Sequence, residues 1–158
     1  MSKVLVAYFS ASGTTAQVAK NLADAAEADL YEIKPAKVYT QADLNWNDKN
    51  SRSSIEMNDR TFRPELADKD SDIAAYDKIL LGFPIWWYVA PTIINSFLES
   101  YDFSGKTIIL FATSGGSGFG KTMQSLVVSC PNATIKEGKM LNRNISRDTL
   151  KKWLESIS

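Results

Sequence analysis

The chain has 158 residues, of which 44% are hydrophobic and 23% are charged, a composition that fits one globular domain spanning residues 1–158. Its 18 basic and 18 acidic residues give a formal charge of zero, so no net field attracts nucleic acid or a membrane surface. The sequence contains no histidine, which excludes Ser-His-Asp and Cys-His catalysis and histidine-based metal sites.

Cysteine usage and the apolar runs indicate where the protein works. The single cysteine, Cys130, cannot form a disulfide within the chain, which favours a reducing compartment. The first apolar run, Val4–Phe9, is shorter than the core of a secretory signal, and no run approaches the ~20 apolar residues of a membrane span. We therefore expect a cytoplasmic protein.

A strand, a loop and a helix are predicted at the start of the chain. The run 3–9 is continuously apolar after Lys3, which is typical of a strand covered on both faces. Val18, Leu22 and Ala25 then recur with a helical period. Between them, hydroxyl side chains surround Gly13, a residue free to adopt any backbone conformation. The N–H groups at the start of a helix, backed by hydroxyls, can bind a phosphate. The predicted phosphate contacts are Ser10, Ser12, Gly13, Thr14 and Thr15. The alternative is a serine-rich turn that only caps the helix.

The next third of the chain is harder to assign. Residues 29–34 nearly alternate between polar and apolar, which predicts an edge strand. Residues 41–72 are polar and show no sustained period, and loops of this length are usually functional or partly disordered. We expect short helical turns and irregular chain over the sheet edge. Trp46 in this segment either covers that edge or reaches toward a ligand.

An aromatic loop follows the second continuous apolar run, 78–83. Two tryptophans and a tyrosine lie between Pro84 and Pro91, at the end of a strand. Such a group can stack on a flat aromatic ligand, and the predicted contacts are Pro84, Ile85, Trp86 and Trp87. The alternatives are a loop that folds back into the core and a dimer surface.

A glycine-rich loop follows the third apolar run, 106–113. Residues 115–122 match the phosphate-binding pattern of nucleotide triphosphatases literally. Against that function, the other strand ends read Tyr-Phe-Ser and Gly-Phe-Pro and lack the aspartate that would hold magnesium. Nucleotide binding therefore stays as a third candidate function. No metal site is expected.

The remaining elements complete an alternating pattern. Helices are predicted after Pro91 (Ile93, Ile94, Phe97, Leu98 and Tyr101), over Met123, Leu126, Val127 and Cys130, and over Leu150, Trp153, Leu154 and Ile157. Ser146 is the expected N-cap of the last helix. An edge strand is predicted over 133–141, and Cys130 is expected to be structural. Alternating strands and helices predict an α/β fold, a three-layer open sandwich around a five-stranded parallel sheet.

Together the loops offer an anion site, an aromatic plate and a glycine-rich wall, which suits a phosphate joined to a planar heterocycle, as in FMN. Ser10-Ala-Ser-Gly-Thr-Thr15, the 77–87 stretch and Thr113-Ser-Gly-Gly116 resemble the phosphate loop and the two flavin-flanking loops of the flavodoxins. The resemblance covers nearly the whole chain. It implies the strand order 2-1-3-4-5, an FMN cofactor, and ring contacts that include Thr113, Ser114, Gly115 and Gly116.

Three departures from the flavodoxin pattern bear on function. The chain is neutral where flavodoxins tend to be acidic, its second flanking loop offers only Phe119 as an aromatic, and residues 83–91 contain no glycine for a peptide flip toward the flavin. We expect an electron carrier between redox partners. The alternative is an FMN-dependent NAD(P)H/quinone-type oxidoreductase, whose open flavin face meets a small molecule. No acid or base in the three loops is expected to be catalytic.

Overall fold

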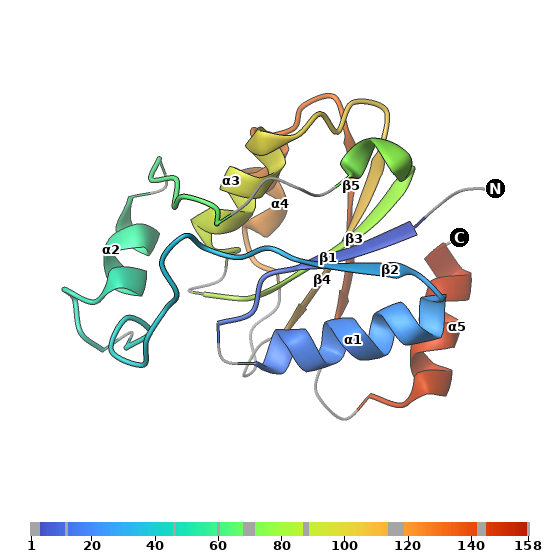
Figure 1. Cartoon of the computed structure of the whole chain (residues 1–158), viewed down its shortest axis with the longest axis horizontal. Coiled ribbons are helices and arrows are strands. Elements are labelled where there is room, and N and C mark those ends of the chain that lie inside the picture. The colour runs from blue at the N-terminus through green and yellow to red at the C-terminus, as the bar shows by residue number, and fades with distance from the viewer. Residues whose placement is uncertain are drawn as a thin grey trace.

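A sheet of parallel strands runs through the computed structural model, which describes residues 4–11, 13–45, 47–59, 61–67, 72–86, 89–113, 119–141 and 145–157. Within these residues the sheet has five strands in the order β2-β1-β3-β4-β5 (Figure 1). The strands are β1 (Val4–Tyr8), β2 (Asp29–Glu32), β3 (Lys78–Pro84), β4 (Thr107–Thr113) and β5 (Thr134–Met140). This confirms the predicted α/β fold and strand order.

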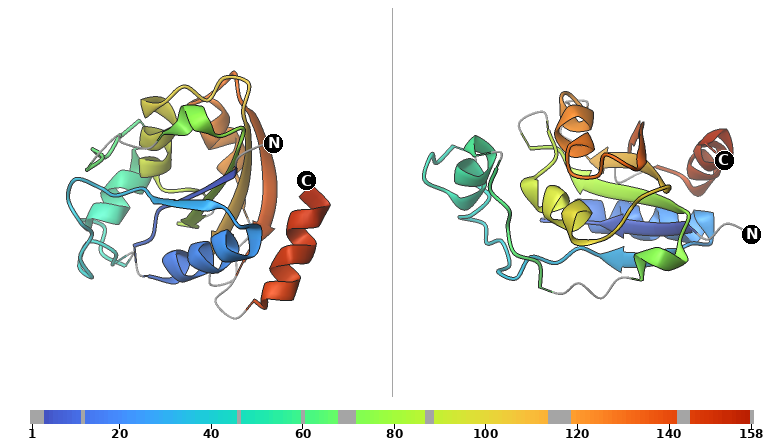
Figure 2. Two further views of the ribbon diagram at one scale, coloured as in Figure 1. Left: turned by 45° about the vertical axis from the view of Figure 1, so that its right-hand side comes forward. Right: turned by 90° about the horizontal axis from the view of Figure 1, so that it is seen from above.

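Helices cover both faces of the sheet (Figure 2). They are α1 (Thr14–Ala26), α2 (Arg52–Asn58), α3 (Thr92–Ser100), α4 (Thr122–Val127) and α5 (Arg147–Ile157), with a short 3-10 helix at Ile73–Ala75. Because side chains alternate along a strand, Leu5 and Ala7 pack under α3 and α4, whereas Val6 and Tyr8 pack under α1 and α5. The central strands are buried on both faces, which is why their sequences read as continuous apolar runs.

The predicted edge strands lie at the two edges of the sheet. β5 contains a bulge, because Leu110 pairs with Glu137 whereas Phe111 pairs with Lys139. Gly138 is the extra residue between them. A Cβ on Gly138 would lie 2.0 Å from the Leu110 carbonyl oxygen and 2.9 Å from the Trp153 ring. The glycine therefore lets α5 pack closely against the last strand.

Two helix predictions differ in outcome. Ser146 caps α5 as expected, since its Oγ accepts a hydrogen bond from the Thr149 N–H at 3.2 Å. The stripe predicted for the preceding helix is wrong at Val127, which is 43% exposed. α4 ends at that residue, so only its Leu126 side faces the core, and Cys130 is buried just beyond it.

The segment 41–72 forms more structure than its sequence pattern indicates. α2 confirms the expected short helical turn. Leu66 forms an antiparallel bridge with Pro35, alongside the extension of β2. The segment was expected to lie over the sheet edge, but α2 lies beyond the carboxyl ends of the strands instead (Figure 1). Among the described helices, none has the length and apolar composition that crossing a membrane requires.

Candidate functional site

The loops singled out in the sequence follow the carboxyl ends of β1, β3 and β4, and the structure brings these three strand ends together. The Phe9 N–H donates to the Gly82 carbonyl oxygen at 3.0 Å, and the Ile85 N–H donates to the Thr113 carbonyl oxygen at 2.9 Å. The hydroxyl oxygens of Thr15 and Thr113 lie 2.7 Å apart. These bonds join the ends of β1, β3 and β4 at the point where the strand order reverses, which is where open α/β sheets bind ligands.

The loop between β1 and α1 has the geometry of an anion site. Gly13 precedes α1 with φ of +96°, and a Cβ there would meet no atom within 4 Å. The Gly13 N–H donates to Ser10 Oγ at 3.0 Å, which holds the loop in a tight turn. The first turn of α1 carries no acidic residue that would repel an anion. An open cradle at a helix N-terminus, lined by hydroxyls, fits a phosphate.

The two threonines behind this loop are buried. Thr15 is 2% exposed and Thr113 is 5% exposed. Each hydroxyl therefore relies on the other for a hydrogen bond, because water does not reach them freely. The pair fixes the start of α1 to the end of β4.

Trp86 belongs to a cluster of three aromatic rings at the same end of the sheet. Its ring meets Phe9 edge-on at 5.9 Å and Tyr39 edge-on at 5.5 Å, measured between centroids. The Trp86 backbone pairs with Val89 through two hydrogen bonds of 2.9 and 3.1 Å. Trp86 is half-buried. It is therefore held by packing and by its backbone just beyond the end of β3, and its stacking on a ligand stays a prediction.

A buried charged group supports this aromatic cluster from α2. The Tyr39 hydroxyl donates a short hydrogen bond to Glu56, a carboxylate that is only 2% exposed. Arg52 Nε lies 2.9 Å from Glu56 Oε2, and the Arg52 guanidinium lies 3.8 Å from the centre of the Tyr39 ring. Burial, followed by the bond to Glu56, raises the pKa of Tyr39 far above its ordinary value. Tyr39, Arg52 and Glu56, the α2 clamp, were not singled out in the sequence.

The structure therefore brings together Ser10, Gly13, Thr14, Thr15, Pro84, Ile85, Trp86 and Thr113 at one end of the sheet. The other predicted contacts, Ser12, Trp87, Ser114, Gly115 and Gly116, lie outside the described residues, as does Trp46.

The triphosphatase-like motif lacks one feature that its chemistry needs. Thr122 is 0% exposed, and its hydroxyl donates to the Phe119 carbonyl oxygen at 2.5 Å. In a nucleotide triphosphatase this hydroxyl would hold magnesium. The motif in this chain instead begins a six-residue helix with a locally bonded threonine.

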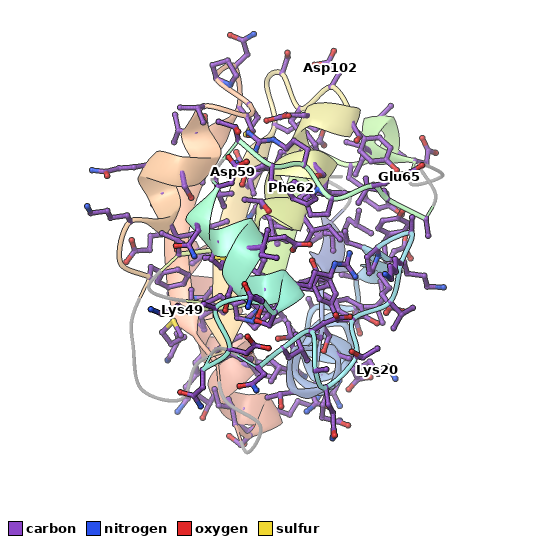
Figure 3. All side chains as sticks on the ribbon, turned by 90° about the vertical axis from the view of Figure 1, so that its left-hand side faces the viewer. Lys20, Lys49, Asp59, Phe62, Glu65 and Asp102 are labelled. Carbon is purple, nitrogen blue, oxygen red and sulfur yellow. The ribbon has the colours of Figure 1, made fainter. Side chains whose placement is uncertain are left out.

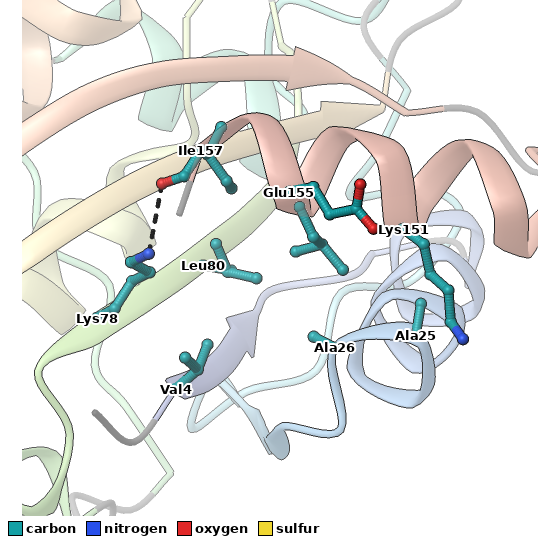
Figure 4. Close-up of a pocket in the computed structure, with 9 residues that line it drawn as sticks. Val4, Ala25, Ala26, Lys78, Leu80, Lys151, Glu155 and Ile157 are labelled. Carbon is teal, nitrogen blue, oxygen red and sulfur yellow. Dashed lines mark hydrogen bonds between the residues drawn. The ribbon is translucent and has the colours of Figure 1, made fainter. Parts of the chain in front are cut away.

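A separate cavity of about 350 Å³ lies at the opposite end of the sheet (Figure 4). Val4 and Lys78, the first residues of β1 and β3, line it together with the end of α5. The Lys78 ammonium donates to the Ile157 carbonyl oxygen at 3.4 Å. This cavity is remote from the converging loops and shares no residue with them.

Known proteins place the chain in a family. A family model described as Flavodoxin matches residues 3–157. The chain belongs to the flavodoxin family. A solved structure of a candidate flavoprotein from Bacteroides uniformis is 52% identical, with 98% of each chain covered and a TM-score of 0.91. This flavodoxin-family protein therefore shares fold and much of its sequence with that flavoprotein.

Two more distant similarities are to a flavoprotein and to a quinone dehydrogenase. A flavoprotein from Lactobacillus acidophilus, solved in complex with FMN, has the same fold at 23% identity and a TM-score of 0.71, covering 98% of this chain and 99% of that one. The NAD(P)H dehydrogenase [quinone] 1 of Rattus norvegicus is 24% identical over 123 residues. The match spans 63% of this chain and 45% of the rat protein, so the chain matches less than half of that enzyme.

Proposed function

We propose that this flavodoxin-family protein binds FMN and carries electrons between redox partners. The observation that supports FMN best is the cradle at Gly13, where an open, hydroxyl-lined helix N-terminus lies beside the ends of β3 and β4. The FMN complex of the Lactobacillus acidophilus flavoprotein supports the same cofactor. The partners are redox proteins or small electron donors and acceptors, with no nucleic acid or membrane involved, in the cytoplasm.

Each loop has its own part in holding the cofactor. Ser10, Ser12, Gly13, Thr14 and Thr15 bind the phosphate, chiefly through backbone N–H groups. The ring lies between the loop 84–87 and the loop 113–116. The α2 clamp acts indirectly, because Tyr39 contacts Trp86 and so restrains the wall against which the ring packs. When bound, FMN supplies the redox chemistry, and these residues bind it, orient it and set its potentials.

An NAD(P)H/quinone-type oxidoreductase is the second candidate function. The similarity to the rat quinone dehydrogenase favours it, as does the absence of a glycine in residues 83–91 for a peptide flip. The carrier is preferred because no acid or base among the predicted contacts requires a catalytic role.

One reconstitution tests the binding of FMN, and one reductive titration then tests the role as an electron carrier. The purified chain should take up FMN and quench its fluorescence; a chain that ignores FMN but binds ATP with magnesium would contradict the cofactor assignment. The FMN complex is then reduced stepwise under anaerobic conditions. Reduction in two resolved one-electron steps supports the carrier. A single two-electron step, with rapid turnover of NADPH and a quinone, would establish the oxidoreductase instead.

A further inference from the structure

A cavity of about 560 Å³ lies between α2, α3 and α4, and we call it the α2–α4 cavity. One wall includes Val89, which is hydrogen-bonded to Trp86. Another wall includes Lys121, which directly precedes α4 at the end of the glycine-rich loop. The cavity thus borders residues that follow shortly after the two predicted flanking loops in the chain. Its volume lies within the roughly 300–1,000 Å³ of small-molecule sites.

The cavity carries positive charge. Its described lining includes Arg63 and Lys121 and no carboxylate. Arg63 Nε lies 3.0 Å from both oxygens of Glu99, and this contact lowers the pKa of Glu99, so the Arg63 charge is balanced locally. Lys121 is exposed, and no carboxylate in the described part of the chain forms an ion pair with it. The net charge of the lining therefore comes from Lys121.

The rest of the lining combines apolar walls with neutral polar groups. Met57 and Val128 supply apolar surface from α2 and from the end of α4. Asn95 is 2% exposed and donates through Nδ2 to the Ser125 carbonyl oxygen at 2.8 Å and to Ser129 Oγ at 2.9 Å. Because the carbonyl can only accept, the amide orientation is fixed. Asn95 Oδ1 is then an acceptor without a partner among the described residues.

Lys121 is the lysine of the triphosphatase-like motif, and magnesium-nucleotide binding does not explain its presence. The Thr122 hydroxyl is committed to Phe119, so a magnesium nucleotide does not explain the adjacent lysine. In the α2–α4 cavity the same lysine faces a space of ligand size with apolar walls.

We propose that the α2–α4 cavity binds a small organic anion, the molecule that exchanges electrons with the cofactor. Lys121 holds the anionic group, and Met57 and Val128 pack against the apolar body. The electron-exchange role rests on the proposed function, whereas anion binding does not. Two sources carry this chemistry, a nicotinamide nucleotide through its phosphates and a quinone bearing an acidic group.

The charge is tested with matched ligands and matched variants. A sulfonated naphthoquinone, the uncharged naphthoquinone and oxidised nicotinamide nucleotide are titrated calorimetrically into the FMN complex at low salt. Lys121→Gln should weaken binding of the anion by about three- to tenfold, because one largely exposed charge pair is lost. The uncharged quinone should bind both proteins equally. Lys20→Gln removes an exposed lysine from α1, away from the cavity, and should change neither affinity (Figure 3).

The position of the site is tested on two adjacent valines. Val128 lines the cavity and is 73% exposed, whereas Val127 is 43% exposed and is absent from the described lining. Val128→Trp should obstruct the cavity and weaken binding of the anion by about tenfold or more, because the larger side chain takes up space that the ligand needs. Val127→Trp should leave the affinity unchanged. Both changes are at exposed positions, so both variants should fold.

The outcomes separate the two proposals. The anion whose affinity falls in both Lys121→Gln and Val128→Trp is the class of ligand that the cavity binds. If neither anion binds the wild-type protein, or if binding ignores both substitutions, the cavity proposal is wrong even when FMN is bound normally. If the chain takes up no FMN yet binds the sulfonate through Lys121, the proposed function fails and the anion site stands.

Discussion

At the scale of single residues, backbone conformation decides what the phosphate loop tolerates. Gly13 has φ of +96° and Gly105 has φ of +76°, and a Cβ at either position would meet no atom within 4 Å. Gly105 lies just before β4, at the opposite end of the sheet from the phosphate loop. The two glycines therefore share a positive φ and an open surrounding. They differ only in that Gly13 lies in the proposed phosphate loop and Gly105 does not.

This pair gives a controlled test of the phosphate loop. Gly13→Ala and Gly105→Ala should each lower the free energy of unfolding by about 1–2 kcal/mol, the cost of a side chain in the left-handed region. Only the change at Gly13 should weaken FMN binding, and Gly13→Val should abolish it. Urea unfolding and fluorescence titration with FMN measure the two quantities. Equal FMN affinities for both alanine variants would place the phosphate elsewhere.

The hydroxyl pair of Thr15 and Thr113 should behave non-additively. Replacing either residue with valine leaves the other hydroxyl buried without its partner, at a cost of about 1–3 kcal/mol in unfolding free energy. The double valine variant removes both polar groups and should be less destabilised than the sum of the single variants. Urea unfolding of all four proteins measures this coupling. Strict additivity would show that the two hydroxyls do not depend on each other.

At the scale of elements, α2 extends the fold beyond the carboxyl ends of the strands and is attached there by its clamp. Arg52 also donates to the Lys37 carbonyl oxygen at 2.6 Å, so the clamp connects α2 with the chain that leaves β2. Ser51 caps the helix, since its Oγ accepts from the Ser54 N–H at 3.3 Å. A seven-residue helix is too short to be stable by itself, so tertiary contacts of this kind must hold it.

Weakening the clamp should therefore loosen α2 before it loosens the sheet. Glu56→Gln keeps a hydrogen-bond acceptor for Tyr39 but removes the charge that Arg52 pairs with. We expect faster hydrogen exchange across Arg52–Asn58 and a loss of about 1–3 kcal/mol in unfolding free energy. Glu65→Gln is the control, because Glu65 is exposed in the chain that follows α2 (Figure 3). Unchanged exchange in Glu56→Gln would show that the clamp does not hold the helix.

The elements differ in how far their sequences predicted them. The buried strands were predictable because covering both faces of a parallel sheet demands continuous apolar runs. The tight turn at Gly13 before α1 was predictable because its residues are adjacent in the chain, and its role in phosphate binding stays a prediction. The role of Glu56 was not predictable, since its partner Tyr39 lies 17 residues away in the chain and no local pattern joins the two residues. The α2–α4 cavity was missed because its lining comes from three helices and the chain around them, which lie far apart in the sequence. Val127 was misassigned because periodicity does not show where a short helix ends.

At the scale of the whole molecule, the carboxyl end of the sheet differs from its two faces. The carboxyl end gathers the hydroxyl loop, the aromatic cluster and the α2–α4 cavity, whereas the two faces are closed by packed helices. The packed layers therefore bury the apolar core, and the carboxyl end holds the proposed ligand sites. Substitutions in the layers should therefore act on unfolding alone, whereas those at the carboxyl end should act on ligand binding and, where they break a buried hydrogen bond, on unfolding as well.

The free energy of unfolding should vary little with pH around neutrality and should fall at alkaline pH. The chain has no histidine, so no side chain with an ordinary pKa near neutrality titrates. Burial raises the pKa of the Cys130 thiol from 9.0 to about 11. The hydrogen bond to Asp29 raises the pKa of Tyr76 from 10.0 to about 12. A group with a raised pKa stabilises the fold below its unfolded value, and that contribution is lost as the pH rises through the folded value.

The free energy of unfolding should therefore be nearly constant from about pH 6 to 8.5 and should fall as the pH rises from about 9 toward 12. On the acid side, the bond from Arg63 lowers the pKa of Glu99 from 4.5, so stability declines as the pH falls below that value. Urea unfolding across this range measures the curve. Tyr76→Phe should flatten the portion between about pH 10 and 12, and Cys130→Ala the portion between about 9 and 11, whatever their effect on stability at neutral pH. A transition between pH 6 and 8, or an alkaline limb that neither substitution changes, would contradict this assignment of the titrating groups.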